Sequence, residues 1–329
     1  MEEITFAIVG TNFVTDMFMT GLNELDGVKV IAVCSKREES LKIFSEKYPG
    51  IPGYLDYKEL VTLENLDAVY LAVPNFLHHE MSMFFMNNGI AVFCEKPLGV
   101  NPTQVREMIA CSRKNKVLLH DGIVPMYARN FWELKERLSE IGPIRRCVFT
   151  QGKYSSRYDA YLRGENPPTF CIEYGNGSLM DMGVYCVAAA LGLFGKPHKI
   201  ISNAEKLPNG IDCLGSALFM YDGFEIVLLH SKVTNTAILS EIQGENGLIQ
   251  IDHLSRMNEI SMQKGSDEKV RLGAPRLNGF TDQLHEFIKN FRLGNYESEM
   301  VGHQFSLDLA EVLFELRQQN DIHFPLYGE

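Results

Sequence analysis

Three side chains in this sequence have types and spacing suited to chemistry at an oxygen atom. Lys96 lies between Glu95 and Pro97, directly after an apolar run. Asp181 and Tyr185 are four residues apart, so a helix would place them on one face. A lysine ammonium can stabilise negative charge developing on an alcohol or carbonyl oxygen, and a phenol can exchange a proton with that oxygen. The three residues are therefore candidate catalytic groups.

Each of these residues also has a structural interpretation. Lys96 can extend to water from the end of a strand, with Glu95 as its partner. Asp181 stands three residues after Ser178, which is the spacing of a capping box at a helix start. Tyr185 lies in an apolar stretch and can pack in a core. The elements around these residues are needed to choose between the two interpretations.

Short apolar runs alternate with amphipathic stretches over about the first 120 residues. The expected strands are Ile4–Val9, Val28–Cys34, Ala68–Val73, Ile90–Cys94 and Val117–His120. The expected helices are Val14–Leu25, Glu38–Lys47, Leu77–Asn88 and Pro102–Asn115. This alternation predicts an α/β domain with a parallel sheet covered on both faces, over residues 1–121. Ligands of such sheets bind beyond the carboxyl ends of the strands, where Lys96 is expected.

The remaining residues, 122–329, show a different rhythm. A long apolar helix is expected from Ser178 to Phe194, and several strand candidates follow it. The dipeptides Asp222-Gly223 and Asn246-Gly247 are strong hairpin signals. Together these features predict an α+β domain with an open, largely antiparallel sheet and helices on one face. An apolar opposite face would need a partner subunit.

The first expected strand leads directly into a candidate dinucleotide-binding loop. The loop comprises Gly10, Thr11, Asn12, Phe13 and Val14. Only the first glycine of the usual three-glycine pattern is present, and Asn12 takes the place of the second. An ordinary strand-to-helix turn is the alternative, but a helix N-terminus at this position can still hold a phosphate.

The second expected strand ends in Ser35, Lys36 and Arg37. Dinucleotide sites selective for NAD usually present an acidic side chain here, whereas a small hydroxyl and cations suit the 2′-phosphate of NADP. A solvated helix start is the structural alternative. The residue types favour NADP, with NAD remaining possible.

The third strand is followed by Pro74 and Asn75, and then by a helix that carries His78 and His79. Asn75 can hydrogen-bond to ribose or nicotinamide, or it can simply cap the helix. The two histidines are adjacent and point apart on a helix, so they make a poor pair of metal ligands. The sequence predicts no metal site.

The composition of the chain argues against nucleic-acid-binding, membrane and secreted proteins. The 329 residues suffice for two domains, and the net charge of −11 opposes binding to nucleic acids or anionic membranes. The seven cysteines are scattered without CxxC spacing, as expected in a reducing cytoplasm. The amino terminus has no signal-peptide pattern, and no apolar run approaches the ~20 residues of a membrane span.

Taken together, these residues resemble the Gfo/Idh/MocA oxidoreductases over nearly the whole chain. The resemblance rests on four segments: the loop at Gly10, the stretch from Pro74 to His78, the triplet Glu95-Lys96-Pro97, and the element from Gly175 to Tyr185. It implies a Rossmann domain, an α+β substrate domain used for dimerisation, and hydride transfer between a nicotinamide and a sugar, polyol or related alcohol. It also implies that Lys96 is the catalytic lysine and that the bond before Pro97 is cis.

Tyr185 stands where most members of the family have histidine. It resembles the branch that contains dihydrodiol dehydrogenase, NADP-dependent xylose dehydrogenase and glucose-fructose oxidoreductase, and Ser35 agrees with that branch. The expected cofactor contacts are the residues from Gly10 to Val14, Ser35 to Arg37, Pro74, Asn75, His78, Glu95 and Lys96. The expected assembly is a homodimer or homotetramer formed through the C-terminal sheet. A non-catalytic, sugar-responsive regulator and a scaffold subunit are the alternatives.

Overall fold

The computed structural model describes residues 3–274 and 279–325. Its contacts divide the chain into two compact units. The first unit comprises Met1–Gly122 and Asn278–Ser306, and the second comprises Ile123–Leu277 and Leu307–Glu329. The boundary expected at residue 121 is close to the end of the first long segment. Residues 279–306, however, belong to the first unit.

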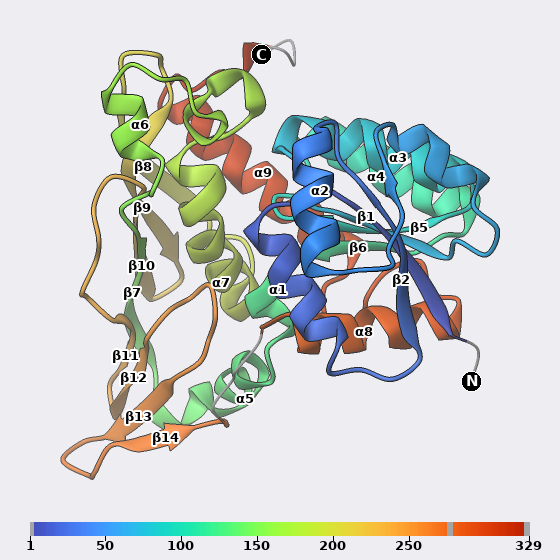
Figure 1. The fold of residues 1–329 in the computed structure, drawn as a ribbon. Helices are drawn as coiled ribbons and strands as arrows, with labels where there is room; N and C mark the ends of the chain where they lie inside the picture. Colours follow the sequence, from blue (N-terminus) through green and yellow to red (C-terminus); the bar gives the residue numbers. More distant parts are fainter. Residues whose placement is uncertain (1–2, 275–278, 326–329) are drawn as a thin grey trace. The chain divides into compact units, whose positions relative to one another are not determined.

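The first unit is built on a six-stranded parallel sheet (Figure 1). In spatial order its strands are β3 (Gly53–Tyr54), β2 (Val28–Cys34), β1 (Ile4–Val9), β4 (Ala68–Leu71), β5 (Ala91–Glu95) and β6 (Leu119–Gly122). Five of these strands were expected from the alternating pattern. The strand β3 was not, because two residues are too short to show a period. The expected parallel α/β architecture is confirmed.

In the described residues, five α-helices lie wholly within this unit. They are α1 (Phe13–Leu22), α2 (Glu38–Lys47), α3 (His78–Asn87), α4 (Pro102–Asn115) and α8 (Gly279–Leu293). The core between the sheet, α1 and α8 is aromatic: the ring of Phe18 stacks on that of Tyr70 at 3.8 Å and meets Phe280 edge to face at 6.2 Å. Phe287 of α8 packs on Phe6 of β1 at 5.1 Å. Burial of these rings explains why α8 returns to the first unit.

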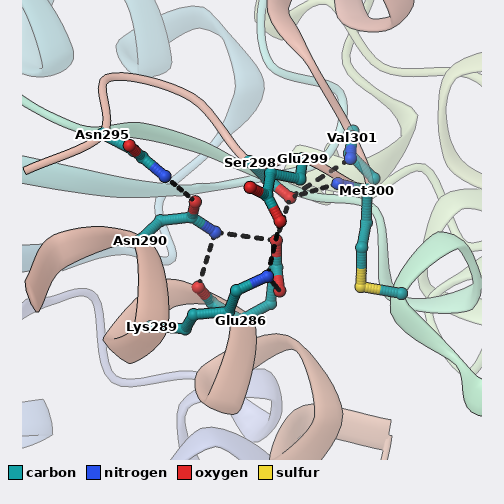
Figure 2. Close-up of polar contacts among 8 residues, drawn as sticks. All are labelled: Glu286, Lys289, Asn290, Asn295, Ser298, Glu299, Met300 and Val301. Carbon is teal, nitrogen blue, oxygen red and sulfur yellow. Dashed lines mark hydrogen bonds and ion pairs between the residues drawn. The ribbon is translucent and has the colours of Figure 1, made fainter. Parts of the chain in front are cut away.

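The connection after α8 is held by a buried carboxylate (Figure 2). Glu286 accepts hydrogen bonds from the Asn290 amide at 2.7 Å and from the Ser298 hydroxyl at 2.8 Å. The Ser298 oxygen in turn accepts from the backbone N–H groups of Met300 and Val301, at 3.0 and 3.2 Å. This network fixes the chain between α8 and α9 (His303–Gln319), since buried polar groups are costly unless they are hydrogen-bonded.

The second unit contains an eight-stranded mixed sheet (Figure 1). In spatial order its strands are β14 (Val270–Leu272), β13 (Ile260–Lys264), β12 (Gly247–Ile251), β11 (Ser240–Gly244), β7 (Ile144–Gly152), β10 (Phe224–Ser231), β9 (Asp212–Tyr221) and β8 (Lys199–Lys206). Only β7 and β10 pair in parallel, so the expected, largely antiparallel sheet is confirmed. The turn Asp222-Gly223 joins β9 to β10, as predicted. The hairpin expected at Asn246-Gly247 joins β11 to β12, but its turn residues are Glu245 and Asn246, and Gly247 is the first residue of β12.

The helices α5 (Arg129–Arg137) and α7 (Val184–Phe194) lie on one face of this sheet, and the short helix α6 (Tyr158–Leu162) lies beyond the end of β7 (Figure 1). The 3₁₀ helices in the described part of the chain are Tyr57–Thr62, Asn75–Leu77, Val124–Tyr127, Leu138–Ile141, Pro168–Phe170 and Ile172–Tyr174. The stretch Ile172–Phe194 is apolar and long enough to cross a membrane, but 72% of its most apolar window is buried inside the protein. A helix in the core of a protein can have the same apolar composition, and this stretch is such a helix.

Candidate functional site

The loop after β1 requires glycine at its first position. Gly10 has φ +105°, and a Cβ atom there would lie 2.1 Å from the carbonyl oxygen of Ala72. The Gly10 N–H donates to the carbonyl of Cys34 at 2.9 Å, and its carbonyl accepts from the Thr15 hydroxyl at 2.9 Å. The loop therefore runs close against the ends of both neighbouring strands, which only a residue without a side chain permits.

Asn12 has a structural task in this loop that its position in the motif did not reveal. Its side-chain oxygen accepts from the Val14 N–H at 2.8 Å, which caps α1. Its amide nitrogen donates to the carbonyl of Ala72 at 2.8 Å. Its backbone is extended, with φ −93°, so the left-handed conformation that asparagine tolerates is not used. Thr11 and Val14 are partly exposed, and Phe13 is 75% exposed at the helix start.

The end of β2 presents Ser35, Lys36 and Arg37 beside this loop. The bond from Gly10 to Cys34 brings the two segments together at the carboxyl edge of the sheet. Ser35 is partly exposed and accepts from the Arg37 N–H at 3.4 Å, while Lys36 and Arg37 are exposed. The Arg37 Nε donates to Ser40 at 3.1 Å, which steadies the guanidinium at the start of α2.

His78 links two loops at the same edge. Its ring is fully buried, with Nδ1 2.8 Å from the carbonyl oxygen of Pro97 and Nε2 2.9 Å from that of Val73. Burial lowers the pKa of His78, and the two carbonyl contacts oppose that shift. A neutral ring donates through one nitrogen only. A neutral His78 therefore donates to one of the two carbonyls and only contacts the other, so that its ring lies between the turn that contains Pro74 and Asn75 and the one that contains Lys96.

Glu95 and Lys96 follow one another at the end of β5 but differ in exposure. Glu95 is buried and accepts from the Tyr70 hydroxyl at 2.8 Å and from the Lys96 N–H at 3.3 Å. Burial raises the pKa of Glu95 to about 7, against the opposing effects of the Tyr70 hydrogen bond and the Lys96 charge. Lys96 is partly exposed at the sheet edge, and the peptide bond before Pro97 is cis, as the family resemblance implied.

The first unit therefore gathers most of the predicted residues at one edge of its sheet. The loops that follow β1, β2, β4 and β5 all leave from the carboxyl ends of parallel, adjacent strands. This arrangement brings together the loop at Gly10, the cations after Ser35, the turn at Asn75 and Lys96. In the described part of the chain, no group of three or more histidine, cysteine or acidic residues could hold a metal ion.

Asp181 and Tyr185 belong to the second unit, where the long helix begins irregularly. Residues Leu179–Gly183 form a π-helical turn that leads into α7. The Ser178 side chain makes no capping bond, so the capping-box alternative is wrong. Instead, the Ser178 hydroxyl lies 2.8 Å from His230 Nδ1, and the buried Asp212 accepts from the Leu179 N–H at 2.6 Å. Such π-helical turns occur frequently at functional sites.

Both candidate residues lie on the least buried side of this helix. Asp181 and Tyr185 are partly exposed, whereas Val184 and the residues from Cys186 to Leu191 are buried. Packing of Tyr185 wholly within the core, the structural alternative for that residue, is therefore not what the structure shows. Asp181 and Tyr185 are thus both partly accessible.

A buried lysine that sequence reasoning missed contacts Asp181. Lys232 Nζ lies 3.2 Å from Asp181 Oδ2, and the Lys232 side chain is 2% exposed against 35% for Asp181. Lys232 follows β10 and is 51 positions from Asp181 along the chain, a spacing without any motif. Only the packing of the helix on the sheet brings the two together, so no local sequence signal identified Lys232.

Asp212 completes the charged surroundings of the helix start. Its burial raises its pKa to about 6, while the bond from the Leu179 N–H and the charge of Lys232 act in the opposite direction. Gly177 has φ +132°, and a Cβ there would lie 2.0 Å from Asp212 Oδ1. Burial also lowers the pKa of His230 to about 4, so this ring is neutral near pH 7.

Comparison with known proteins identifies relatives along the full length of the chain. Residues 4–123 match the family model Gfo/Idh/MocA, described as an oxidoreductase family with an NAD-binding Rossmann fold. A scyllo-inositol 2-dehydrogenase (NADP(+)), IolU from Bacillus subtilis, is 38% identical over 98% of both chains. The mouse trans-1,2-dihydrobenzene-1,2-diol dehydrogenase, which belongs to the branch suggested by Tyr185, is 28% identical over 98% of both chains.

A solved structure extends the comparison to three dimensions. The 3-ketoreductase KijD10 from Actinomadura kijaniata, crystallised with TDP-benzene and NADP, superposes with a TM-score of 0.83 and 21% identity. The match covers 97% of this chain and 98% of that chain. At this identity the likeness shows a shared fold, which agrees with the two expected domain types.

Proposed function

The chain belongs to the Gfo/Idh/MocA family of oxidoreductases, and from this membership we propose an NADP(H)-dependent enzyme. Its substrate is a sugar, polyol, dihydrodiol or related carbonyl or alcohol. When bound, the nicotinamide supplies or accepts the hydride, and the protein residues manage the charge and the proton at the reacting oxygen. The observation that carries the proposal is the convergence of the Gly10 loop, the cations after Ser35 and Lys96 at one sheet edge.

The residues at this edge fit a dinucleotide phosphate. The absence of a side chain at Gly10 lets the loop lie against Ala72, and the N-terminus of α1, an end of a helix that favours anions, follows the loop directly. Asn12 fixes this geometry with two hydrogen bonds, so the loss of the second glycine is compensated by a cap. Thr11, Phe13 and Val14 are the partly or largely exposed neighbours of that phosphate position.

The cations after β2 favour NADP over NAD. Lys36 and Arg37 are exposed beside the Ser35 hydroxyl, and the part of β2 that precedes them offers no acidic side chain to a ribose 2′-hydroxyl. Arginine binds phosphate oxygens with two parallel N–H bonds, and lysine adds a point charge. This charge pattern agrees with the cofactor named for the Bacillus subtilis relative.

Lys96, Tyr185 and Asp181 carry the chemistry in this proposal. In the reductive direction Lys96 stabilises negative charge on the substrate oxygen, and Tyr185 donates a proton to it. Asp181 orients the substrate and the phenol. Pro74 and Asn75 contact the cofactor, while His78 and Glu95 support it by holding the turn that presents Lys96.

Substitution of Lys96 tests the assignment. We expect Lys96→Met to lower turnover by at least about 10³-fold, because a preorganised charge at the reacting oxygen is among the largest catalytic contributions. NADPH binding, followed by fluorescence titration, is expected to persist. Turnover is measured with a panel of aldoses, inositols, dihydrodiols and short dicarbonyls, beginning with scyllo-inositol. The control is Lys114→Met on the exposed surface of α4. Undiminished activity of Lys96→Met would sink the assignment.

We further propose that the enzyme works in the cytoplasm as a homodimer or homotetramer. All seven cysteines are free and buried, which suits a reducing compartment. On the sheet face opposite α7, the apolar side chains of Leu218, Val227 and Val148 stand side by side on β9, β10 and β7 and are only partly buried. A second copy would cover them. Light scattering coupled to size-exclusion chromatography distinguishes these assemblies from a monomer, the result that would contradict the proposal.

A further inference from the structure

Lys232 is a buried cation whose contacts all belong to the surroundings of Asp181. Its ammonium lies 3.2 Å from Asp181 Oδ2 and donates to the Thr169 carbonyl at 3.0 Å. The same ammonium sits over the ring of Phe170, 5.1 Å from its centroid. A buried lysine is unfavourable unless its charge is compensated. Here the carboxylate, the carbonyl and the aromatic face together provide that compensation.

The backbone fixes Lys232 from both sides. Its N–H donates to the Cys213 carbonyl at 2.9 Å, and its own carbonyl accepts from the Ser155 N–H at 2.8 Å. These bonds tie the residue to β9 and to the chain that follows β7. The position of the ammonium is therefore set by the sheet, which is the most rigid part of the unit.

The two partners of the ion pair differ in exposure, and this difference suggests the role of Lys232. The Lys232 side chain is almost fully enclosed, whereas 35% of the Asp181 side chain remains accessible. A leucine or methionine would fill the same volume without the cost of burying a charge. The ammonium contacts one oxygen of a carboxylate that shares its helix face with Tyr185. A purely packing role does not account for a cation at this point.

We propose that Lys232 is a positioning residue that holds the Asp181 carboxylate oriented beside Tyr185. This inference rests on the proposed function, because it takes Asp181 as part of the reacting site. Lys232 itself is enclosed by the Thr169–Phe170 segment and acts through Asp181, without contacting substrate. The Lys232 charge also opposes the effect of burial, which raises the pKa of the neighbouring Asp212.

A double-mutant cycle on kcat tests this role. The four proteins are the wild type, Lys232→Met, Asp181→Asn and the double variant, each assayed with NADP(H) and the best substrate of the panel above. We expect Lys232→Met to lower kcat by about 10- to 100-fold while KM changes by less than about threefold, because misplacing a catalytic group mainly affects the reacting state. In the Asp181→Asn background the same substitution is expected to lower kcat by less than about threefold.

The control is Lys206→Met at the end of β8 in the same sheet. The Lys206 ammonium also donates to carbonyl oxygens, at 3.0 and 3.3 Å, but it is exposed and is expected to leave kcat unchanged. Circular dichroism and thermal unfolding verify that each variant is folded. Where Lys232→Met does not fold, Lys232→Gln takes its place in the same cycle, since an amide can keep the bond to Thr169.

The outcomes separate this inference from the function on which it rests. If Asp181→Asn leaves kcat unchanged, Asp181 is not part of the reacting site and the proposed function is wrong in that respect. If Asp181→Asn is impaired but Lys232→Met lowers kcat by equal factors in both backgrounds, Lys232 acts independently of Asp181 and only this inference is overturned. An unchanged kcat in Lys232→Met overturns it as well.

Discussion

Ser35 lies at the end of β2, where its hydroxyl accepts a hydrogen bond from the Arg37 N–H at 3.4 Å. Ser35→Asp would place a carboxylate beside Lys36 and Arg37, where it repels a 2′-phosphate and accepts from a free ribose hydroxyl. We expect kcat/KM for NADPH to fall at least about 10-fold relative to NADH, since a carboxylate–phosphate repulsion of roughly 1.4 kcal/mol corresponds to that factor. Steady-state kinetics with both cofactors measure the ratio.

Ser45→Asp on the exposed side of α2 is the matched control, because it adds the same charge to the same unit away from the strand end. The cofactor ratio of this control is expected to equal that of the wild type. If the ratio of kcat/KM for NADPH to that for NADH in Ser35→Asp also equals the wild-type ratio, the residues after β2 do not recognise the 2′-phosphate.

Single residues were predictable where a motif connects neighbours in the sequence. Lys96 could be singled out because an apolar strand, a charged pair and a proline follow one another. Lys232 could not, since its only relation to Asp181 is the packing of a helix start on the end of β10. Ser178 shows the opposite case: its spacing to Asp181 satisfies a capping box, but its hydroxyl faces His230 instead.

The path of the whole loop between β1 and α1 depends on the absence of a side chain at Gly10. Gly10→Ala places a Cβ atom 2.1 Å from the Ala72 oxygen at a φ of +105°, so the loop must move away from β4. We expect a loss of roughly 1–3 kcal/mol in the free energy of unfolding. NADPH affinity is expected to fall at least about 10-fold, because displaced backbone N–H groups no longer converge on the phosphate.

Gly89→Ala separates the clash from the backbone strain. Gly89 also has a positive φ, +78°, but a Cβ there meets nothing within 4 Å. This control should be destabilised by only about 1 kcal/mol and should bind NADPH like the wild type. Urea unfolding and fluorescence titration measure the two quantities. Wild-type NADPH affinity in Gly10→Ala would show that the loop does not hold the cofactor.

Regular helices and strands could be predicted from the period of their apolar residues and from the residue types of their turns, but irregular elements could not. Most strands and helices of the first unit follow the alternating pattern, and the two Asx-Gly dipeptides lie at the hairpins that they indicated, with Gly247 already in β12. The π-helical turn Leu179–Gly183 carries no sequence signal, because it depends on Asp212 from β9 accepting the Leu179 N–H. The hydrogen bond by which Asn12 holds the loop in place of the second glycine could not be predicted either, since its partner Ala72 is 60 residues away.

At the scale of the molecule, the sequence pattern was sufficient to predict one parallel and one largely antiparallel sheet. It was not sufficient to predict that α8 belongs to the first unit. The sequence from Thr281 to Phe291 has a helical pattern, yet nothing in its spacing shows which sheet that helix covers. The choice follows from shape: Phe280 and Phe287 complete an aromatic core that Phe18 and Phe6 leave open. Such complementarity of shape is a property of the packed chain. The buried Glu286 then fixes the segment that follows α8 through its bonds with Asn290 and Ser298.

Buried carboxyl groups link the stability of the protein to pH, and Glu95 provides the clearest case. Burial raises its pKa from 4.5 to about 7, so between these values the folded protein binds more protons than the unfolded chain. The favourable contribution of neutral Glu95 is complete below the unfolded pKa and is lost as the pH rises through about 7. His120 and His230, with lowered pKa values, act in the opposite sense below about 6.5. A variant at Glu95 alone is therefore needed to isolate its effect.

Glu95→Gln keeps an acceptor for the Tyr70 hydroxyl and removes the titration. Relative to the wild type, we expect this variant to gain stability as the pH rises from 5 to 8, by up to about 3 kcal/mol at 1.36 kcal/mol per pKa unit. Urea unfolding at pH 5, 6, 7 and 8 measures the difference, with Glu46→Gln on exposed α2 as the control. Parallel pH profiles for wild type and Glu95→Gln would show that the carboxyl next to Lys96 is already ionised at pH 5. In that case Glu95 would support Lys96 as a fixed negative charge rather than as a group that titrates near neutrality.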